Sequence, residues 1–220
     1  MIELIVKVVA SYLVGALVGS LIVGRLRGGV DIRTLGSGNA GGTNALRTQG
    51  KRFALWVMLI DIGKGLIATR VIAPLPLSGL GLAGSAATLG ALRDWLPVAC
   101  GLAAIIGHIY PVWHGFRGGK GVATLVGVLF GIDPLLLLLT LLTWLVAAML
   151  LGFVGLASIL SAAAVPLYVI AFDIEPQAPI IAFGLAVALL VVYTHRGNIA
   201  RMLAGTEPRA RRLWLFGRGR

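Results

Sequence analysis

The sequence predicts an all-α fold, a polytopic membrane bundle of about seven transmembrane helices, some of them short or broken. Of its 220 residues 58% are hydrophobic and only 12% are charged, a balance that a water-soluble domain with a polar surface could hardly reach. The glycines are too numerous for ordinary soluble helices but suit membrane helices that pack closely through small residues. We interpret residues 1–220 as one domain.

The hydrophobic runs of the first part alternate with loops whose charge predicts the orientation. Ile2 to Val23 has the ~20 residues of a spanning helix. No cleavage site with a soluble body follows it, so we interpret it as a retained helix and not as a signal peptide. Between Gly24 and Arg52 six basic residues accompany only Asp31, and basic loops mark the cytoplasmic side. The run Phe53 to Ala73 then leads to an uncharged turn, Pro74 to Gly84, so we expect that turn and the N-terminus outside.

The next runs include a broken segment and a short one. Ser85 to Ile106 is apolar except for Arg93-Asp94, which pair or mark a break between two shorter helices; we count one crossing. Val122 to Ile132 is too short to span straight, and Asp133-Pro134 starts another helix that runs to Leu151. Short helices beside Gly-rich segments bring backbone donors to polar sites in membrane proteins.

The last runs place the C-terminus in the cytoplasm. After a turn near Gly152, a helix ends near Phe172, and the acidic loop Asp173 to Pro176 is expected outside. The run Ala178 to Tyr193 returns inside and precedes a basic cytoplasmic tail, residues 195–220. Seven crossings satisfy every charge cluster, and six or eight remain open because of the Arg93-Asp94 break.

The net charge of +11 does not indicate nucleic acid binding, because the basic residues lie between apolar runs and in the tail. Membrane lipid is the expected partner of that charge. Cys100 is the only cysteine, which excludes an intrachain disulfide framework. Carboxylates and histidines do not occur at ligand spacing, so we expect no metal and no cofactor.

The first polar segment, Gly36 to Arg47, has the composition of a phosphate-binding loop. Its glycines allow backbone amides to converge on one point, and Arg47 adds a forked cation. A flexible cytoplasmic loop is the alternative, but a linker seldom needs so many amide side chains. The candidate residues are Ser37, Asn39, Gly42, Thr43, Asn44 and Arg47.

The second polar segment, Gly107 to Thr124, places Gly-Gly-Lys-Gly directly before an apolar helix, and helix N-termini bind anions. It is not a Walker A loop, because glycine follows the lysine where Ser or Thr is required. Basic residues that contact lipid headgroups are the alternative; they would explain the charges but not the glycines. The candidate residues are Gly118, Gly119, Lys120, Gly121 and Thr124.

The third segment, Thr194 to Glu207, opens where the last helix leaves the membrane. His195 and Asn198 are three residues apart and share a face if the helix continues, although a purely topological role is equally open. Asp61 and Lys64, inside a span, pair with each other or line a polar cavity. Ser158, at the start of a helix, is a further candidate site residue. The alternative is that it only caps or packs the helix.

Taken together, the three segments resemble the acyl-phosphate-dependent glycerol-3-phosphate acyltransferase (PlsY) family over essentially the whole chain. The resemblance implies a membrane enzyme that transfers a fatty acyl group from acyl phosphate to the first hydroxyl of sn-glycerol 3-phosphate. The products would be lysophosphatidate and phosphate, in the first step of phospholipid synthesis. The residues that carry the resemblance are Gly36-Ser37-Gly38-Asn39, Gly42-Thr43-Asn44, Arg47, Gly107-His108, Pro111, Gly118 to Thr124, His195-Arg196, Asn198-Ile199, Arg201, Gly205 and Glu207.

The resemblance also implies roles for individual residues. Ser37 and Arg47 would be needed for activity, the second segment would serve the glycerol-phosphate site, His195 and Asn198 would complete the pocket, and Glu207 would be more structural. It implies a monomer in the cell inner membrane whose active site faces the cytoplasm. The chain departs from the family pattern at Tyr110, where Phe is commoner, and at Gly155, where Ser is frequent, which leaves the role of Ser158 open.

The residue types suit a reaction between two phosphorylated substrates. Because acyl phosphate is already activated, the enzyme needs charge clamps and orientation more than a strong nucleophile. We expect Lys120, the Gly118–Gly121 amides and Arg47 to hold phosphate groups. The attacking hydroxyl needs a base, either His195 or a substrate phosphate. The candidates for steadying the carbonyl oxyanion are Asn39, Thr43, Asn44 and Asn198.

Three other classes of protein share part of this pattern or catalyse a similar reaction. Acyltransferases of the His-x4-Asp type are excluded, because no histidine here is followed five residues later by Asp. A small anion or phosphate-ester transporter or channel would share the basic loops and broken helix, but it would have polar sites near mid-membrane and usually duplicated halves. A scaffold membrane protein would tolerate the loss of Ser37 or Lys120.

Overall fold

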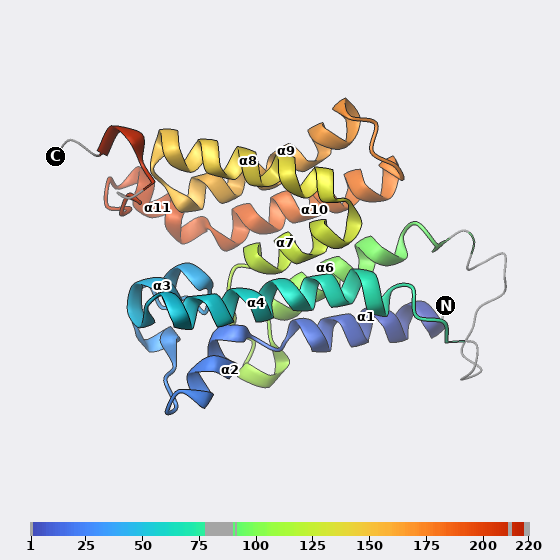
Figure 1. Cartoon of the computed structure of the whole chain (residues 1–220), viewed down its shortest axis with the longest axis horizontal. Coiled ribbons are helices and arrows are strands. Elements are labelled where there is room, and N and C mark those ends of the chain that lie inside the picture. The colour runs from blue at the N-terminus through green and yellow to red at the C-terminus, as the bar shows by residue number, and fades with distance from the viewer. Residues whose placement is uncertain (1, 78–89, 91, 211–212, 218–220) are drawn as a thin grey trace. The chain divides into compact units, whose positions relative to one another are not determined.

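The computed structural model describes residues 2–77, 90, 92–210 and 213–217 (Figure 1). Every regular element within these ranges is helical, as the composition predicts. The chain divides into two compact units, residues 1–132 (unit 1) and 133–220 (unit 2).

Unit 1 is built from helices separated by two polar loops. Its long apolar helices provide the packing, and its short helices flank the loops. The described elements are α1 (Ile2–Gly15), α2 (Gly19–Leu26), the 3-10 turn η1 (Ile32–Thr34), α3 (Gly42–Gln49), α4 (Lys51–Ile67), its π-helical continuation η2 (Ala68–Ile72), α6 (Leu96–Ile109), the 3-10 turn η4 (Val112–His114) and α7 (Val122–Ile132).

Helices α1 and α6 pack through glycines at backbone contact. A Cβ atom on Gly15 would fall 2.2 Å from the carbonyl oxygen of Ala104, and one on Gly107 would fall 2.2 Å from that of Tyr12. Only glycine permits so close an approach, which is how small residues replace the hydrophobic effect between membrane helices. The end of α6, where the second polar segment begins, is therefore fixed against α1.

Helices α4 and α7 pack in the same way. A Cβ atom on Gly65 would lie 2.2 Å from the carbonyl oxygen of Thr124, and one on Gly127 would lie 1.9 Å from that of Ile62. Helix α7 has 11 residues, about 17 Å at 1.5 Å per residue, which is short of the ~30 Å hydrocarbon core. The prediction that this segment is too short to span straight is confirmed.

Unit 2 contains three long apolar helices and a short polar one: α8 (Pro134–Leu151), α9 (Val154–Ala171), α10 (Gln177–Thr194) and α11 (Arg196–Leu203), with the 3-10 turn η5 (Leu215–Gly217) near its end. Helix α8 begins directly after Asp133, as expected, and the Asp133 side chain caps it by accepting a hydrogen bond from the Leu136 amide at 2.7 Å. Pro166 lies inside α9, where Gly184 of α10 makes room for its ring.

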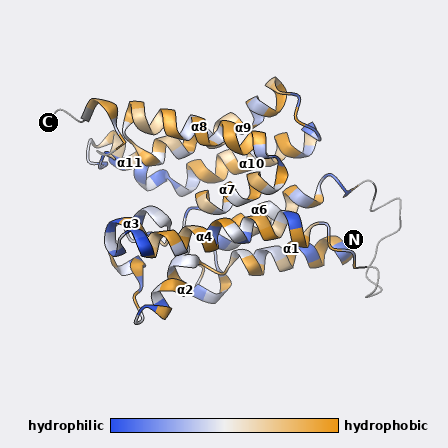
Figure 2. Cartoon of the chain, viewed as in Figure 1, coloured by the Kyte–Doolittle hydropathy of each residue, from blue (hydrophilic) through white to orange (hydrophobic). Residues whose placement is uncertain are grey.

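Four helical segments in the described ranges are long and apolar enough to cross a membrane: Leu96–His114, α8, α9 and α10. The pair α1 and α2, bent by 46° at its break, is a possible fifth. Figure 2 shows hydrophobic residues along α8, α9 and α10, whereas hydrophilic residues gather around α3. The helical membrane class is thus supported, and the count of seven crossings stays a prediction.

Two of the helix breaks considered from the sequence are present in the structure. Residues Arg93 to Trp95 form a turn directly before α6, which places the Arg93-Asp94 pair at a break. His195 ends α10 and precedes α11, so the helix does not continue unbroken through the third segment. Parts of three predicted segments lie outside the described residues: 78–84 of the outside turn, 85–89 and 91 of the following run, and 211–212 and 218–220 of the tail.

Candidate active site

The first polar segment is organised by the buried side chain of Asn44, which is 2% exposed. Its carboxamide oxygen accepts a hydrogen bond from the Ser37 amide at 3.0 Å. Its nitrogen lies 2.9–3.0 Å from the carbonyl oxygens of Ile32, Leu35 and Asn39. Both ends of the carboxamide are therefore used within the loop, and the contacts give Asn44 a structural task that the sequence did not indicate.

The other polar residues of this segment lie on its outside. Ser37, Thr43 and Arg47 are exposed, and Asn39 is half-buried. Thr43 and Arg47 are four residues apart in α3 and share a face, whereas the neighbouring Asn44 side chain is buried. No side chain caps the N-terminus of α3, which begins at Gly42. The exposed groups and this helix end together offer neutral donors, backbone amides and one cation to an anion.

The second polar segment folds into a tight turn under α6. The amides of Gly118 and Gly119 donate to the carbonyl oxygens of Ile109 and His108, both at 3.1 Å. Two of the four amides expected to hold phosphate are therefore already satisfied within the protein. These glycines serve close packing instead, because a Cβ atom on Gly119 would fall 2.1 Å from Nε2 of His108. Lys120 follows these two glycines and is half-buried, and α7 begins at Val122 as predicted.

Arg33 joins the two polar segments. Its Nη1 donates to the carbonyl oxygens of His114 at 3.1 Å and Arg117 at 3.0 Å, more than 80 residues away in sequence. The remaining face of the guanidinium is taken by Asp31, whose carboxylate accepts from Nε and, at 2.7 Å, from Nη2. Arg33 therefore acts as a clamp between the loops, with its charge balanced by Asp31.

The Arg33 clamp shifts the titration of both partners. The hydrogen bonds from the Arg33 side chain hold the pKa of Asp31 below its ordinary value of 3.8, against the opposing effect of burial. The hydrogen bond to Asp31 likewise raises the pKa of Arg33 above its ordinary value. Both groups are thus charged near neutral pH. The signal that could have identified this clamp is an Asp-x-Arg pair directly before the Gly-rich loop.

Behind the second segment lies a buried ionic cluster. Asp61 and Lys64 of α4 pair at 3.0 Å, which confirms one of the two sequence interpretations of these residues. His108, at the end of α6, joins them with Nδ1 at 2.7 Å from Lys64 Nζ. The three-residue spacing in the sequence indicated the Asp61–Lys64 pair, but it did not indicate His108 as the third member of the cluster.

Thr124, a further candidate, lies in the first turn of α7 and is fully buried. Among the described residues its hydroxyl oxygen has no hydrogen-bond partner.

In unit 2, the ring of His195 is fixed by its own helix. Its Nδ1 lies 2.8 Å from the carbonyl oxygen of Val191. Because a carbonyl oxygen only accepts, Nδ1 carries a proton in this contact, and neutral His195 has its lone pair on Nε2. A histidine in this form can accept a proton at Nε2.

Asn198 is held between α9 and the end of the third segment. Its Nδ2 donates to Oε1 of Glu207 at 2.6 Å, and Arg201 Nε donates to Oε2 of the same carboxylate at 2.6 Å. Gly155 packs against the Asn198 side chain so closely that a Cβ atom there would fall 3.0 Å from Asn198 Cβ. These contacts support the structural role implied for Glu207, because this carboxylate orients Asn198.

Ser158 lies one turn beyond Gly155 in α9. Its hydroxyl donates to the carbonyl oxygen of Val154 at 3.0 Å and accepts from the Trp144 indole nitrogen at 3.2 Å. In these contacts Ser158 joins α9 to α8, as a packing residue does.

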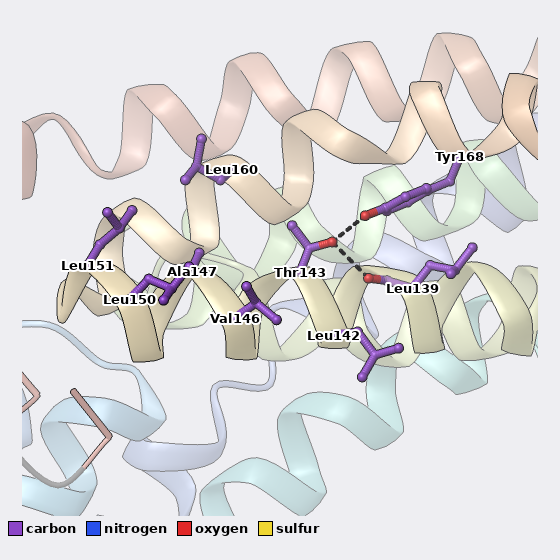
Figure 3. A pocket seen from close by; sticks show the side chains of 9 residues that line it. All are labelled: Leu139, Leu142, Thr143, Val146, Ala147, Leu150, Leu151, Leu160 and Tyr168. Atoms are coloured by element: carbon purple, nitrogen blue, oxygen red, sulfur yellow. Dashed lines mark hydrogen bonds between the residues drawn. The ribbon is translucent and has the colours of Figure 1, made fainter. Parts of the chain in front are cut away.

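Unit 2 also carries an apolar groove of about 460 Å³ that sequence reasoning did not anticipate. Figure 3 shows that the Thr143 hydroxyl in this groove is hydrogen-bonded to the Tyr168 hydroxyl and to the Leu139 carbonyl oxygen. Such a lining suits a hydrocarbon chain. The residues that line it are Leu139, Leu142, Thr143, Val146, Ala147, Leu150, Leu151, Leu160 and Tyr168.

The structure thus assembles the candidates into two groups. Unit 1 brings the first and second segments together through Arg33, and unit 2 brings His195, Asn198 and Glu207 beside the start of α9. Within the described residues no three His, Cys, Asp or Glu side chains are placed to hold a metal ion.

Known proteins share both the sequence and the fold. Residues 5–205 match the model of a family described as glycerol-3-phosphate acyltransferase. Curated proteins of that name from Chlorobaculum tepidum and Paramagnetospirillum magneticum are 39% and 41% identical. The alignments cover 95% of this chain in both cases, and 97% and 94% of the two relatives.

Two crystal structures of PlsY (YgiH), an integral membrane glycerol 3-phosphate acyltransferase, have the same fold. The glycerol 3-phosphate form matches with a TM-score of 0.78 at 33% identity, and the lysophosphatidic acid form with 0.77 at 32%. Each match covers 94% of both chains. Family model, curated relatives and structures agree over nearly the whole chain, so the chain belongs to the glycerol-3-phosphate acyltransferase family.

Proposed function

We propose that this protein transfers a fatty acyl group from acyl phosphate to the sn-1 hydroxyl of glycerol 3-phosphate, giving lysophosphatidate and phosphate. The observation that carries the proposal is the clamp in unit 1, where Arg33 ties the loop with Ser37 and Arg47 to the loop with Lys120. Two glycine-rich basic loops held together suit phosphorylated substrates. The glycerol 3-phosphate and lysophosphatidic acid forms of the family relative PlsY support the same substrate and product.

The reaction needs charge compensation at two phosphates. The glycerol hydroxyl attacks the acyl carbonyl carbon, an ester C–O bond forms, the anhydride C–O bond breaks, and phosphate leaves. Arg47 and Lys120 neutralise the phosphate charges, with the amides at the α3 N-terminus as further donors. Ser37, Asn39, Thr43 and Asn198 are the candidate donors to the reacting oxygens. Asn44 supports the reaction by holding Ser37 in place.

The proton of the attacking hydroxyl goes either to His195 or to a substrate phosphate. The hydrogen bond from Nδ1 to Val191 favours His195 as an acceptor at Nε2. A His195→Ala variant separates the two. A lower kcat with an unchanged pH profile indicates that His195 only positions substrate, whereas loss of a titration near neutral pH identifies it as the base.

The proposal extends to the membrane arrangement. We propose a monomer with seven crossings in the cell inner membrane, with the N-terminus outside and the three polar segments at the cytoplasmic face. It rests on the positive-inside distribution of charge. Cysteines introduced in the first loop and in the Pro74–Leu77 turn, labelled from either side of vesicles in a Cys100→Ala background, test this orientation.

The decisive experiment is incubation of the purified protein with palmitoyl phosphate and labelled glycerol 3-phosphate. We expect a lipid-soluble labelled product with acyl phosphate, and none with palmitoyl-coenzyme A or acyl carrier protein as donor. No product from acyl phosphates of any tested chain length would overturn the proposal. Flux of glycerol 3-phosphate into protein-containing liposomes without product would support the transporter class instead.

A further inference from the structure

Asp61, Lys64 and His108 form a cluster of ionisable side chains that is buried in unit 1. The three residues are 0%, 3% and 2% exposed. Ionisable residues at such depth in a membrane protein are costly, and those that persist usually serve a function. The reaction proposed above uses none of them.

All three N–H donors of the Lys64 ammonium are accounted for. Nζ lies 3.0 Å from Oδ1 of Asp61, 3.0 Å from the carbonyl oxygen of Leu17 and 2.7 Å from Nδ1 of His108. The first two partners are oxygens that accept. A hydrogen on Nδ1, in a neutral or a cationic ring, would point at the ammonium donor 2.7 Å away, so Nδ1 accepts the third hydrogen, although Oδ1 of Asp61 also lies 3.3 Å from it. His108 is then neutral, and its proton is on Nε2.

The Nε2 side of this ring lies against the turn that carries Lys120. A Cβ atom on Gly119 would fall 2.1 Å from Nε2, so the ring is in contact with the main chain of Gly119. The carbonyl oxygen of His108 also accepts the Gly119 amide at 3.1 Å. His108 therefore holds the turn both through its backbone and through a ring whose orientation Lys64 sets.

Asp61 fixes the position of Lys64 from the other side. Its Oδ1 also accepts the amide of Gly19 at 3.0 Å, at the start of α2, and thus secures the α1–α2 break. Within the described part of the chain its Oδ2 has no hydrogen-bond partner. A buried carboxylate with one oxygen left without a hydrogen bond contributes little to stability, because its desolvation is not fully compensated.

We propose that Asp61, Lys64 and His108 form a buried positioning relay that holds the Gly118–Gly121 turn, and with it Lys120, in its phosphate-binding position. The proposal rests on the proposed function, in which Lys120 holds a substrate phosphate. Asp61 orients Lys64, Lys64 orients the His108 ring, and the ring supports the turn. The relay transfers no proton and contacts no substrate.

The kinetic test is the double variant Asp61→Asn/Lys64→Met. It keeps the site electrically neutral and keeps an acceptor for Gly19, but it removes the donor that orients His108. We expect the KM for glycerol 3-phosphate to rise about tenfold, the size of effect seen when a group that orients a ligand is lost, with a smaller change in kcat. The measurement is steady-state kinetics of the full-length enzyme with palmitoyl phosphate.

A matched control exists in the same unit. Glu3 and Lys7 of α1 form another buried pair at 2.7 Å, in which Lys7 also donates to the carbonyl oxygen of Ala73. The variant Glu3→Gln/Lys7→Met removes a buried charge pair of the same kind, located in the first two turns of α1 beside Ala73. We expect its KM to match the wild type. Equal KM values for both double variants would contradict the relay.

Two further measurements test the relay if the double variant does not fold. Nitrogen-15 NMR of labelled histidine should find the proton of His108 on Nε2, and a proton on Nδ1 would contradict the relay.

His108→Gln places an amide near the former Nε2, whereas His108→Asn reaches only as far as Nδ1. We expect about tenfold higher kcat/KM for the Gln variant, and equal loss would count against the relay. A wild-type enzyme inactive with palmitoyl phosphate would contradict the proposed function and leave the NMR result standing.

Discussion

The carboxamide oxygen of Asn44 accepts the backbone amide of Ser37 at 3.0 Å, across the glycine-rich bend of the first loop. The same side chain donates to carbonyl oxygens of residues that flank the bend, Ile32 and Leu35 before it and Asn39 after it. One carboxamide thus determines where an exposed serine lies.

We expect Asn44→Asp to be almost as harmful as Asn44→Ala. A carboxylate still accepts from Ser37, but it cannot donate to Ile32, Leu35 and Asn39, and its charge faces their carbonyl oxygens. Both variants should lower kcat/KM by about tenfold or more, since each loses hydrogen bonds worth ~1 kcal/mol apiece. Gln49→Ala, in the same helix, serves as the control. An active Asp variant would show that the donor contacts are dispensable.

Arg33→Lys tests the clamp between the loops. Lysine keeps the charge but lacks the planar fork that reaches Asp31, His114 and Arg117 together. We expect kcat/KM for glycerol 3-phosphate to fall about tenfold. Arg27→Ala, which removes an exposed cation from the same loop, should remain near wild type. A Lys variant as active as wild type would mean that charge alone matters at position 33.

The pH dependence of stability tests the Asp31–Arg33 pair separately. The Arg33 hydrogen bonds lower the pKa of Asp31. The stabilisation is therefore complete above the unfolded-state pKa, about 3.9, and is lost as pH falls through the lower folded-state pKa. The difference in melting temperature between wild type and Asp31→Asn should be constant from neutral pH to about pH 5 and shrink below about pH 4. A difference that changes between pH 8 and 6 would implicate another group.

Glu207→Ala should affect turnover through Asn198. The variant removes the acceptor that holds Asn198 Nδ2 and the partner of Arg201. Glu207→Gln retains an acceptor oxygen, so we expect it to keep more kcat than the Ala variant, although it loses the ion pair. Arg201→Ala removes only the half-exposed ionic partner and should have the smallest effect, because such pairs contribute little. The reverse order, with Arg201→Ala the worst, would assign the role to the ion pair.

Gly119→Ala should be harmful although the new group is a single methyl. Its Cβ would meet Nε2 of His108 at 2.1 Å, and this buried ring is held by Lys64, so the turn must move. We expect a KM for glycerol 3-phosphate raised about tenfold or more, as for other displaced substrate-binding groups. Gly63→Ala, where a Cβ meets nothing within 4 Å, is the control. An unchanged KM would show that the turn tolerates displacement.

The sequence by itself determined the helical membrane class, the three polar segments and the shortness of α7. These follow from hydropathy, charge and residue type, which are properties of local stretches of chain. Family resemblance carried the reaction type, because the three segments occur together in order. It did not separate residues that face a substrate from residues that build the loops.

Only the tertiary structure decided that division. Asn44 is inside its loop, two amides of the second segment are bonded to α6, Arg33 bridges more than 80 residues, and His108 completes a pair that looked isolated on α4. The reason is physical: a hydrogen bond between distant segments depends on how helices pack, here through glycines at backbone contact. No local pattern of hydropathy or spacing records which donor meets which acceptor.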